Sequence, residues 1–178
     1  MSLFAVSCVG SDRPGIVAAV TAVLVDHGCN LEDSSMSILR GHFAMMLVVT
    51  GPEALTADAL EAALADSAET LDLVVAVRAI DDTVPTRNAG DAWTISVYGS
   101  DRPGIVHGFT DMLERAGINI VDLSTRIIGG TDRPVYVMIL EVTLPAGVDG
   151  VELTSDLVDM ASELGVEASA HPSEADIL

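Results

Sequence analysis

Two short stretches of the sequence carry the residues best suited to hold a small charged ligand. Gly-Ser-Asp-Arg-Pro-Gly-Ile-Val is written at residues 10–17 and again at residues 99–106. Proline suits the first turn of a helix, so each copy predicts a helix that opens at Pro14 or Pro103. The backbone N–H groups at a helix start have no partner within the helix, and they attract anions such as a carboxylate.

An aspartate stands just before each predicted helix start. Its carboxylate could hold an ammonium group, or it could cap the helix that follows. An α-amino acid carries a carboxylate and an ammonium group on the same carbon, so a loop that offers amides and an aspartate suits that ligand. The residues expected to contribute are Asp12, Gly15 and Ile16 in the first copy and Asp101, Gly104 and Ile105 in the second.

An asparagine follows the far end of each predicted helix. Asn30 and Asn119 occupy matching places in the two copies, and each side-chain amide can both donate and accept hydrogen bonds. The alternative is a turn residue that tolerates left-handed backbone angles. The predicted site also includes the residues that come next, Leu31 and Ile120.

Other functional residues give weaker signals. Arg13 and Arg102 either position the loop or bind a carboxylate. The histidines show no metal-ligand spacing, so neither a metal nor a cofactor is expected. His107 could approach a ligand, but Ala18 takes its place in the first copy, so the two copies share no histidine role. The chain has no lysine, which excludes Schiff-base chemistry.

The whole sequence is strongly acidic, with a formal net charge of −19 over 178 residues. Such a chain repels phosphate polyanions, so direct binding to nucleic acid is not expected. The longest nearly apolar stretch, 16–25, is too short to span a membrane, and the N-terminus lacks the features of a signal peptide. We therefore expect a cytoplasmic protein that does not bind membranes.

The repeated loop belongs to a longer internal repeat. Residues 4–41 match residues 93–130 at 17 of 38 positions without a gap. A duplicated unit predicts two domains, at 1–80 and 92–173, with a polar linker at 81–91 and a tail at 174–178.

Each unit shows the same order of predicted elements: strand, helix, strand, strand, helix, strand. Alternating and helical apolar spacings predict strands at 3–9, 31–39, 43–50 and 72–80 with a second helix at 56–69, and, in the second unit, strands at 92–98 and 166–170 with a helix at 151–164. Two right-handed crossovers in this order predict an α+β fold: two ferredoxin-like βαββαβ domains, each an antiparallel sheet with both helices on one face.

The loops, together with the stretches that end in Gly-Cys-Asn and Gly-Ile-Asn, resemble ACT domains, small regulatory modules that sense amino acids. The tandem arrangement is similar to the family of the glycine cleavage system transcriptional repressor. The resemblance implies the ferredoxin-like fold and a ligand site at a domain interface. It also implies contacts to an amino acid from Asp12 with Asn30 and from Asp101 with Asn119.

The function expected from this resemblance is non-catalytic. An amino acid effector would bind, and the signal would pass to a protein partner such as a transcription factor, in the regulation of amino-acid (glycine) metabolism. Bare sheet faces in both units favour a homodimer. Two alternatives stay open: a ligand-free interaction scaffold, and a small acylphosphatase-like hydrolase that would use Arg13 and Asn30.

Overall fold

The computed structural model describes residues 1–81, 90–129 and 134–173. The chain divides into two compact units, Met1–Val84 and Pro85–Leu178. Most of the predicted linker (82–89) and the predicted tail lie outside the described residues.

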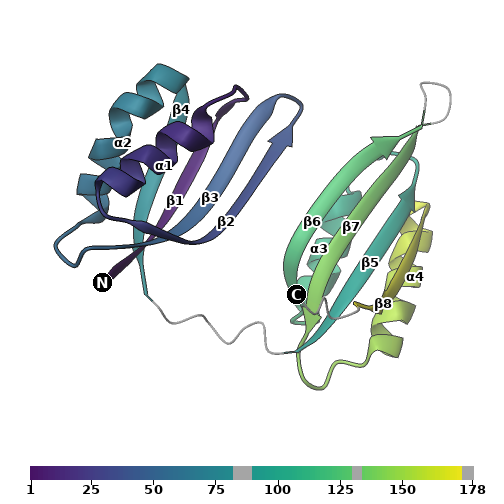
Figure 1. Ribbon diagram of the computed structural model, residues 1–178. Coiled ribbons are helices and arrows are strands. Elements are labelled where there is room, and N and C mark those ends of the chain that lie inside the picture. Colours follow the sequence, from purple (N-terminus) through teal and green to yellow (C-terminus); the bar gives the residue numbers. More distant parts are fainter. Residues whose placement is uncertain (82–89, 130–133, 174–178) are drawn as a thin grey trace. The chain divides into compact units, whose positions relative to one another are not determined.

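The first unit is a single antiparallel sheet with two helices. Its strands are ordered β2-β3-β1-β4, and both helices lie on one face (Figure 1). The elements are β1 (Ser2–Ser11), α1 (Ile16–Asp26), β2 (Asn30–Leu39), β3 (His42–Gly51), α2 (Ala57–Leu71) and β4 (Leu73–Ile80).

The second unit repeats this topology with the strand order β6-β7-β5-β8. Its elements are β5 (Asp91–Gly99), α3 (Ile105–Arg115), β6 (Asn119–Ile128), β7 (Val135–Leu144), α4 (Gly150–Leu164) and β8 (Val166–Pro172). The predicted fold, two ferredoxin-like domains, is confirmed. No helix among the described residues is long and apolar enough to cross a membrane.

Each unit has its own core between the sheet and the helices. Along β3 the burial alternates, because successive side chains point to opposite faces of a strand. The helix-facing side chains of β3 are buried with one stripe of α1, and this cluster includes Phe43, Met45, Leu47, Val49, Ile16, Val20 and Leu24. The equivalent cluster in the second unit joins β7 to α3 and α4.

The predicted helix start at Pro14 is wrong by two residues. Gly15 has a φ of 98° and Gly104 a φ of 97°, in the left-handed region, so neither residue belongs to a helical turn. Each helix begins at the isoleucine that follows. Pro14 and Pro103 therefore belong to a tight turn ahead of the helix, and the glycine is the residue that turns the chain into it.

Candidate functional site

The loop between β1 and α1 is tied to the hairpin at the same end of the sheet. The backbone N–H of Asp12 donates a 2.9 Å hydrogen bond to the carbonyl of Gly41. Gly41 and Arg40 form the tip of the β2–β3 hairpin, with φ values of 81° and 51°. This contact fixes where the loop leaves the strand, and with it the place of the aspartate.

The glycine of each loop begins the hydrogen bonding of its helix and leaves open space beside it. The carbonyl of Gly15 accepts from the N–H of Ala19 at 2.9 Å, and that of Gly104 from Gly108 at 2.8 Å. A side chain placed on either glycine would meet nothing within 4 Å. An incoming group can therefore approach the first N–H groups of the helix without a steric barrier.

The aspartates do not cap the helices. The N-cap residue of each helix is a glycine, and among the described residues neither aspartate side chain makes a hydrogen bond. Asp12 and Asp101 are both exposed. The capping alternative is thus wrong, and each carboxylate stands in solvent next to a helix start, where a positive group of a ligand can reach it.

Asn30, which was predicted to contact the same ligand as this loop, lies at the other end of the sheet. Ser11 is opposite His42 on β3, whereas Asn30 is opposite Thr50. Eight residues of strand separate those two positions, which is roughly 27 Å at the rise of an antiparallel strand. Asp12 and Asn30 of one unit therefore cannot touch the same small molecule, and the second unit has the same layout for Asp101 and Asn119.

Asn30 has a defined role in its own unit. Its Nδ2 donates to Oε1 of Glu32 at 3.1 Å, and the same oxygen accepts from the Thr50 hydroxyl at 2.7 Å. These bonds, the one from Thr50 first, hold the pKa of Glu32 below its ordinary value. Asn30 lies in β2 and has no left-handed angles, so the turn-residue alternative is also wrong.

The remaining predicted residues lie beside these two places. Ile16 and Ile105 begin the helices and are buried, with 1% of each exposed, so only their backbone can face a ligand. Leu31 is 45% exposed and Ile120 half-buried at the starts of β2 and β6. Each strand shifts register just after them, with Glu32 as the extra residue in one unit and Val121 in the other.

The loop of the second unit borders an open depression of about 670 Å³. The loop, the first turns of α3 and two side chains of the sheet line it, and those side chains are Thr125 and Tyr136. Sequence reasoning missed both. A comparison of the two repeats could have found them, because Tyr136 and Thr125 are polar residues at the places that Phe43 and Met36 occupy in the first unit.

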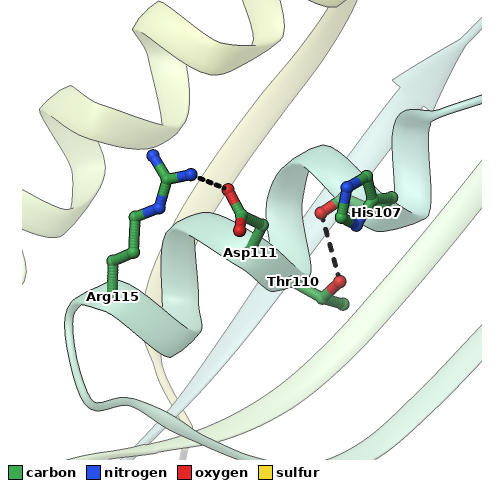
Figure 2. A network of polar contacts seen from close by, with 4 residues as sticks. All are labelled: His107, Thr110, Asp111 and Arg115. Carbon is green, nitrogen blue, oxygen red and sulfur yellow. Dashed lines mark hydrogen bonds and ion pairs between the residues drawn. The ribbon is translucent and has the colours of Figure 1, made fainter.

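Helix α3, whose first turns line the depression, carries polar bonds of its own (Figure 2). The hydroxyl of Thr110 donates to the backbone carbonyl of His107 at 3.2 Å. Asp111 and Arg115 form an ion pair of 2.7 Å one turn apart. Asp111 is therefore engaged along the helix, and Asp101 is the one carboxylate that lines the depression.

No group of three or more potential metal ligands occurs among the described residues. Each loop offers a ligand two features: a helix start with free space beside it, and an exposed carboxylate.

Comparison with known proteins places this geometry in a family. A model of the ACT domain matches residues 2–78 and again residues 93–169. The glycine cleavage system transcriptional repressor of Escherichia coli (strain K12) is 25% identical over 167 residues, which cover 92% of this chain and 86% of the repressor.

Two further proteins are similar over nearly the whole chain. The crystal structure of an unknown protein from Galdieria sulphuraria has a TM-score of 0.81 and 28% sequence identity, with 97% of this chain and 99% of that one covered. Phosphoserine phosphatase SerB2 of Mycobacterium tuberculosis is 28% identical over 166 residues, but these make up only 39% of the phosphatase.

The two matched segments fall one in each compact unit, and together they account for most of the sequence. The chain belongs to the ACT domain family and contains two such domains in tandem.

Proposed function

We propose that this protein is a non-catalytic regulator that binds a small amino acid and passes the signal to a protein partner. A regulatory role agrees with the two ACT domains and with the similarity to the glycine cleavage system transcriptional repressor. The partner would be a protein such as a transcription factor, and the regulated process the metabolism of amino acids, with glycine as the first candidate.

One observation carries this proposal. Both loops place an exposed aspartate, free of any capping bond, beside a helix start whose glycine leaves open space. Helix N–H groups favour the carboxylate of a zwitterion, and the aspartate favours its ammonium group. An α-amino acid carries these two opposite charges on groups bonded to one carbon, so both fit within a small site.

The distance between the loop and the asparagine of one domain limits how both could contact one ligand. Because Asp12 and Asn30 lie at opposite ends of their sheet, a site that uses both kinds of residue takes them from different ACT domains. We also propose a homodimer, in which domains of two chains pair and cover the bare faces of their sheets. Light scattering at micromolar concentration would show twice the mass of one chain, and a monomer would contradict this part of the proposal.

The placement of the residues argues against the hydrolase alternative. An acylphosphatase-like site would need Arg13 and Asn30 around one phosphate, and the sheet separates them by nearly its full length. The similarity to SerB2 gives no support for catalysis, because the chain covers 39% of that phosphatase. A colorimetric acyl-phosphate assay should give no turnover.

Thermal-shift measurements with the twenty common amino acids test the main proposal. At a ligand concentration of 100 Kd, binding to the folded state adds about 2.7 kcal/mol of stability, enough to raise Tm by several degrees. The double variant Asp12→Ala/Asp101→Ala should lose the shift. Asp66→Ala, an exposed acid within α2, is the matched control and should keep it.

A wild-type protein whose Tm responds to none of the amino acids would overturn the sensor proposal. In that case the ligand-free scaffold becomes the better account of the same fold.

A further inference from the structure

Tyr136 differs from the other core side chains, because it brings a hydroxyl group to the edge of the core. It lies on β7, opposite Gly99, the last residue before the loop, and belongs to the buried cluster under α3. Only 8% of it is exposed, yet it lines the depression next to the loop. Within the described parts of the chain its hydroxyl makes no hydrogen bond.

The hydroxyl is not enclosed in the core, because no buried side-chain oxygen or nitrogen among the described residues lacks a hydrogen-bond partner. The depression is the side from which a partner can arrive. Burial raises the pKa of Tyr136, and the negative charge of Asp101 raises it further. The phenol is therefore neutral at pH 7, and the charge of the Asp101 carboxylate acts on it.

The first unit has the same loop but an apolar wall. Gly-Ser-Asp-Arg-Pro-Gly-Ile-Val is identical in both, so the loops themselves do not differ. Three positions around them do: Ala18, Met36 and Phe43 in the first unit become His107, Thr125 and Tyr136 in the second. The helix-facing side of the second site thus offers polar groups that the first one lacks.

We propose that the loop of the second unit is the amino acid site, that Asp101 and the hydroxyl of Tyr136 together hold the ligand's ammonium group, and that the first loop is not an equivalent site. An ammonium group has three N–H donors, and a single carboxylate leaves at least one without a partner. The phenol oxygen supplies a further acceptor at the same place. Phe43 supplies none, so a zwitterion at the first loop would stay short of a partner.

This inference rests on the proposed function and sharpens it. It assigns the ligand to one of two loops with identical sequences, and it names the side chain that makes the difference.

The test is isothermal titration calorimetry of the full chain with the twenty common amino acids. The wild type should bind with about one ligand per chain. Tyr136→Phe removes one oxygen and keeps the ring, and it should weaken binding by about tenfold or more, the usual effect of losing a hydrogen bond to a charged group. Phe43→Tyr, the reciprocal change in the first unit, is the matched control and should leave the affinity of the wild-type site unchanged.

A second measurement does not depend on the variants. In a chain labelled with ¹³C-tyrosine, the ligand should shift the ring resonance of Tyr136. Tyr98, which lies on β5 and does not line this depression, should stay unchanged and serves as the internal reference.

The outcomes separate this inference from the function beneath it. If no amino acid binds the wild type, both fail. If an amino acid binds with two equal sites per chain, or if Tyr136→Phe binds as tightly as the wild type, the present inference is overturned and the sensor proposal stands.

Discussion

The side chain of Asn30 is bonded to Glu32, the residue at the register shift of β2, through a hydrogen bond of 3.1 Å. Thr50, across on β3, donates to the same carboxylate oxygen at 2.7 Å. In the second unit Val121, an apolar residue, takes the place of Glu32. The two asparagines share a place in the fold and differ in their surroundings.

The pKa of Glu32 gives the first prediction. Its folded-state value is lowered, chiefly by Thr50 and then by Asn30. The carboxylate therefore contributes stability above the ordinary glutamate pKa of about 4.3, and that contribution is lost as the pH falls through the lowered value. Thr50→Val should raise the pKa toward the ordinary one, measured by NMR titration of the Glu32 side chain.

The equivalent threonine of the second unit provides the control for this titration. Thr143 lies opposite Asn119, as Thr50 lies opposite Asn30. Thr143→Val should leave the titration of Glu32 unchanged. An unaltered Glu32 pKa in Thr50→Val would show that the 2.7 Å bond is not made in solution.

The loop glycines give the second prediction. Gly15 and Gly104 have φ values of 98° and 97°, with no atom close to where a side chain would start. Alanine at either position would therefore add backbone strain without a steric clash, which costs about 1–2 kcal/mol of stability. Urea unfolding of Gly15→Ala and Gly104→Ala should show it. Gly15→Asn should cost less, because asparagine tolerates positive φ better than alanine does.

Much of this architecture can be predicted from the sequence, because both copies of the repeat indicate the same order of strands and helices. The apolar spacing of Ile16, Val17, Val20, Val23 and Leu24 predicts a helix. Helix α1 buries Ile16, Val20 and Leu24, whereas Val17 is 42% exposed. The start of the helix was misplaced for a local reason. A proline followed by glycine fits both a first helical turn and a left-handed turn before it, and the sequence does not say which one the backbone adopts.

The site was harder to predict, because it depends on contacts between distant parts of the chain. The bond from Asn30 to Glu32 follows from the register shift between Leu31 and Asp33, which no apolar pattern announces. Tyr136 looks like an ordinary strand residue, and only the fold shows that it lines the depression beside the loop of the second unit. Both features arise from packing and register, which local sequence does not encode.

The ends of α2 and α4 give the third prediction. Asp72 closes α2 with a φ of 54°, whereas Gly165 closes α4 in the same left-handed region. A non-glycine residue is strained there, and a negative charge at a helix C-terminus opposes the helix dipole. Asp72→Gly should therefore stabilise the first unit by roughly 0.5–1 kcal/mol.

Asp72→Asn separates the two causes, because it removes the charge and keeps a side chain that tolerates left-handed angles. Its gain should shrink at high salt, which screens the dipole interaction. Urea unfolding at two salt concentrations measures both effects. If Asp72→Gly is no more stable than the wild type at either concentration, the assumed strain is absent.

The cysteines give the last prediction. Cys8 is fully buried in the core of the first unit, and burial raises its pKa to about 11. Cys29 is only half-buried, and burial raises its pKa as well. Iodoacetamide at pH 8.5 should therefore modify Cys29 first and Cys8 only after unfolding, because the thiolate is the reactive form and the reagent must also reach it.

The same shift predicts how stability depends on alkaline pH. The folded state holds the Cys8 proton up to about pH 11, whereas the unfolded thiol ionises near pH 9. Between these values the unfolded state binds fewer protons, so the free energy of unfolding decreases as the pH rises. Cys8→Ala should flatten this decline in urea unfolding series from pH 8 to pH 11, and Cys29→Ala should keep most of it. Equal slopes in the wild type and Cys8→Ala would mean that the Cys8 thiol ionises in the folded core as readily as in the unfolded chain.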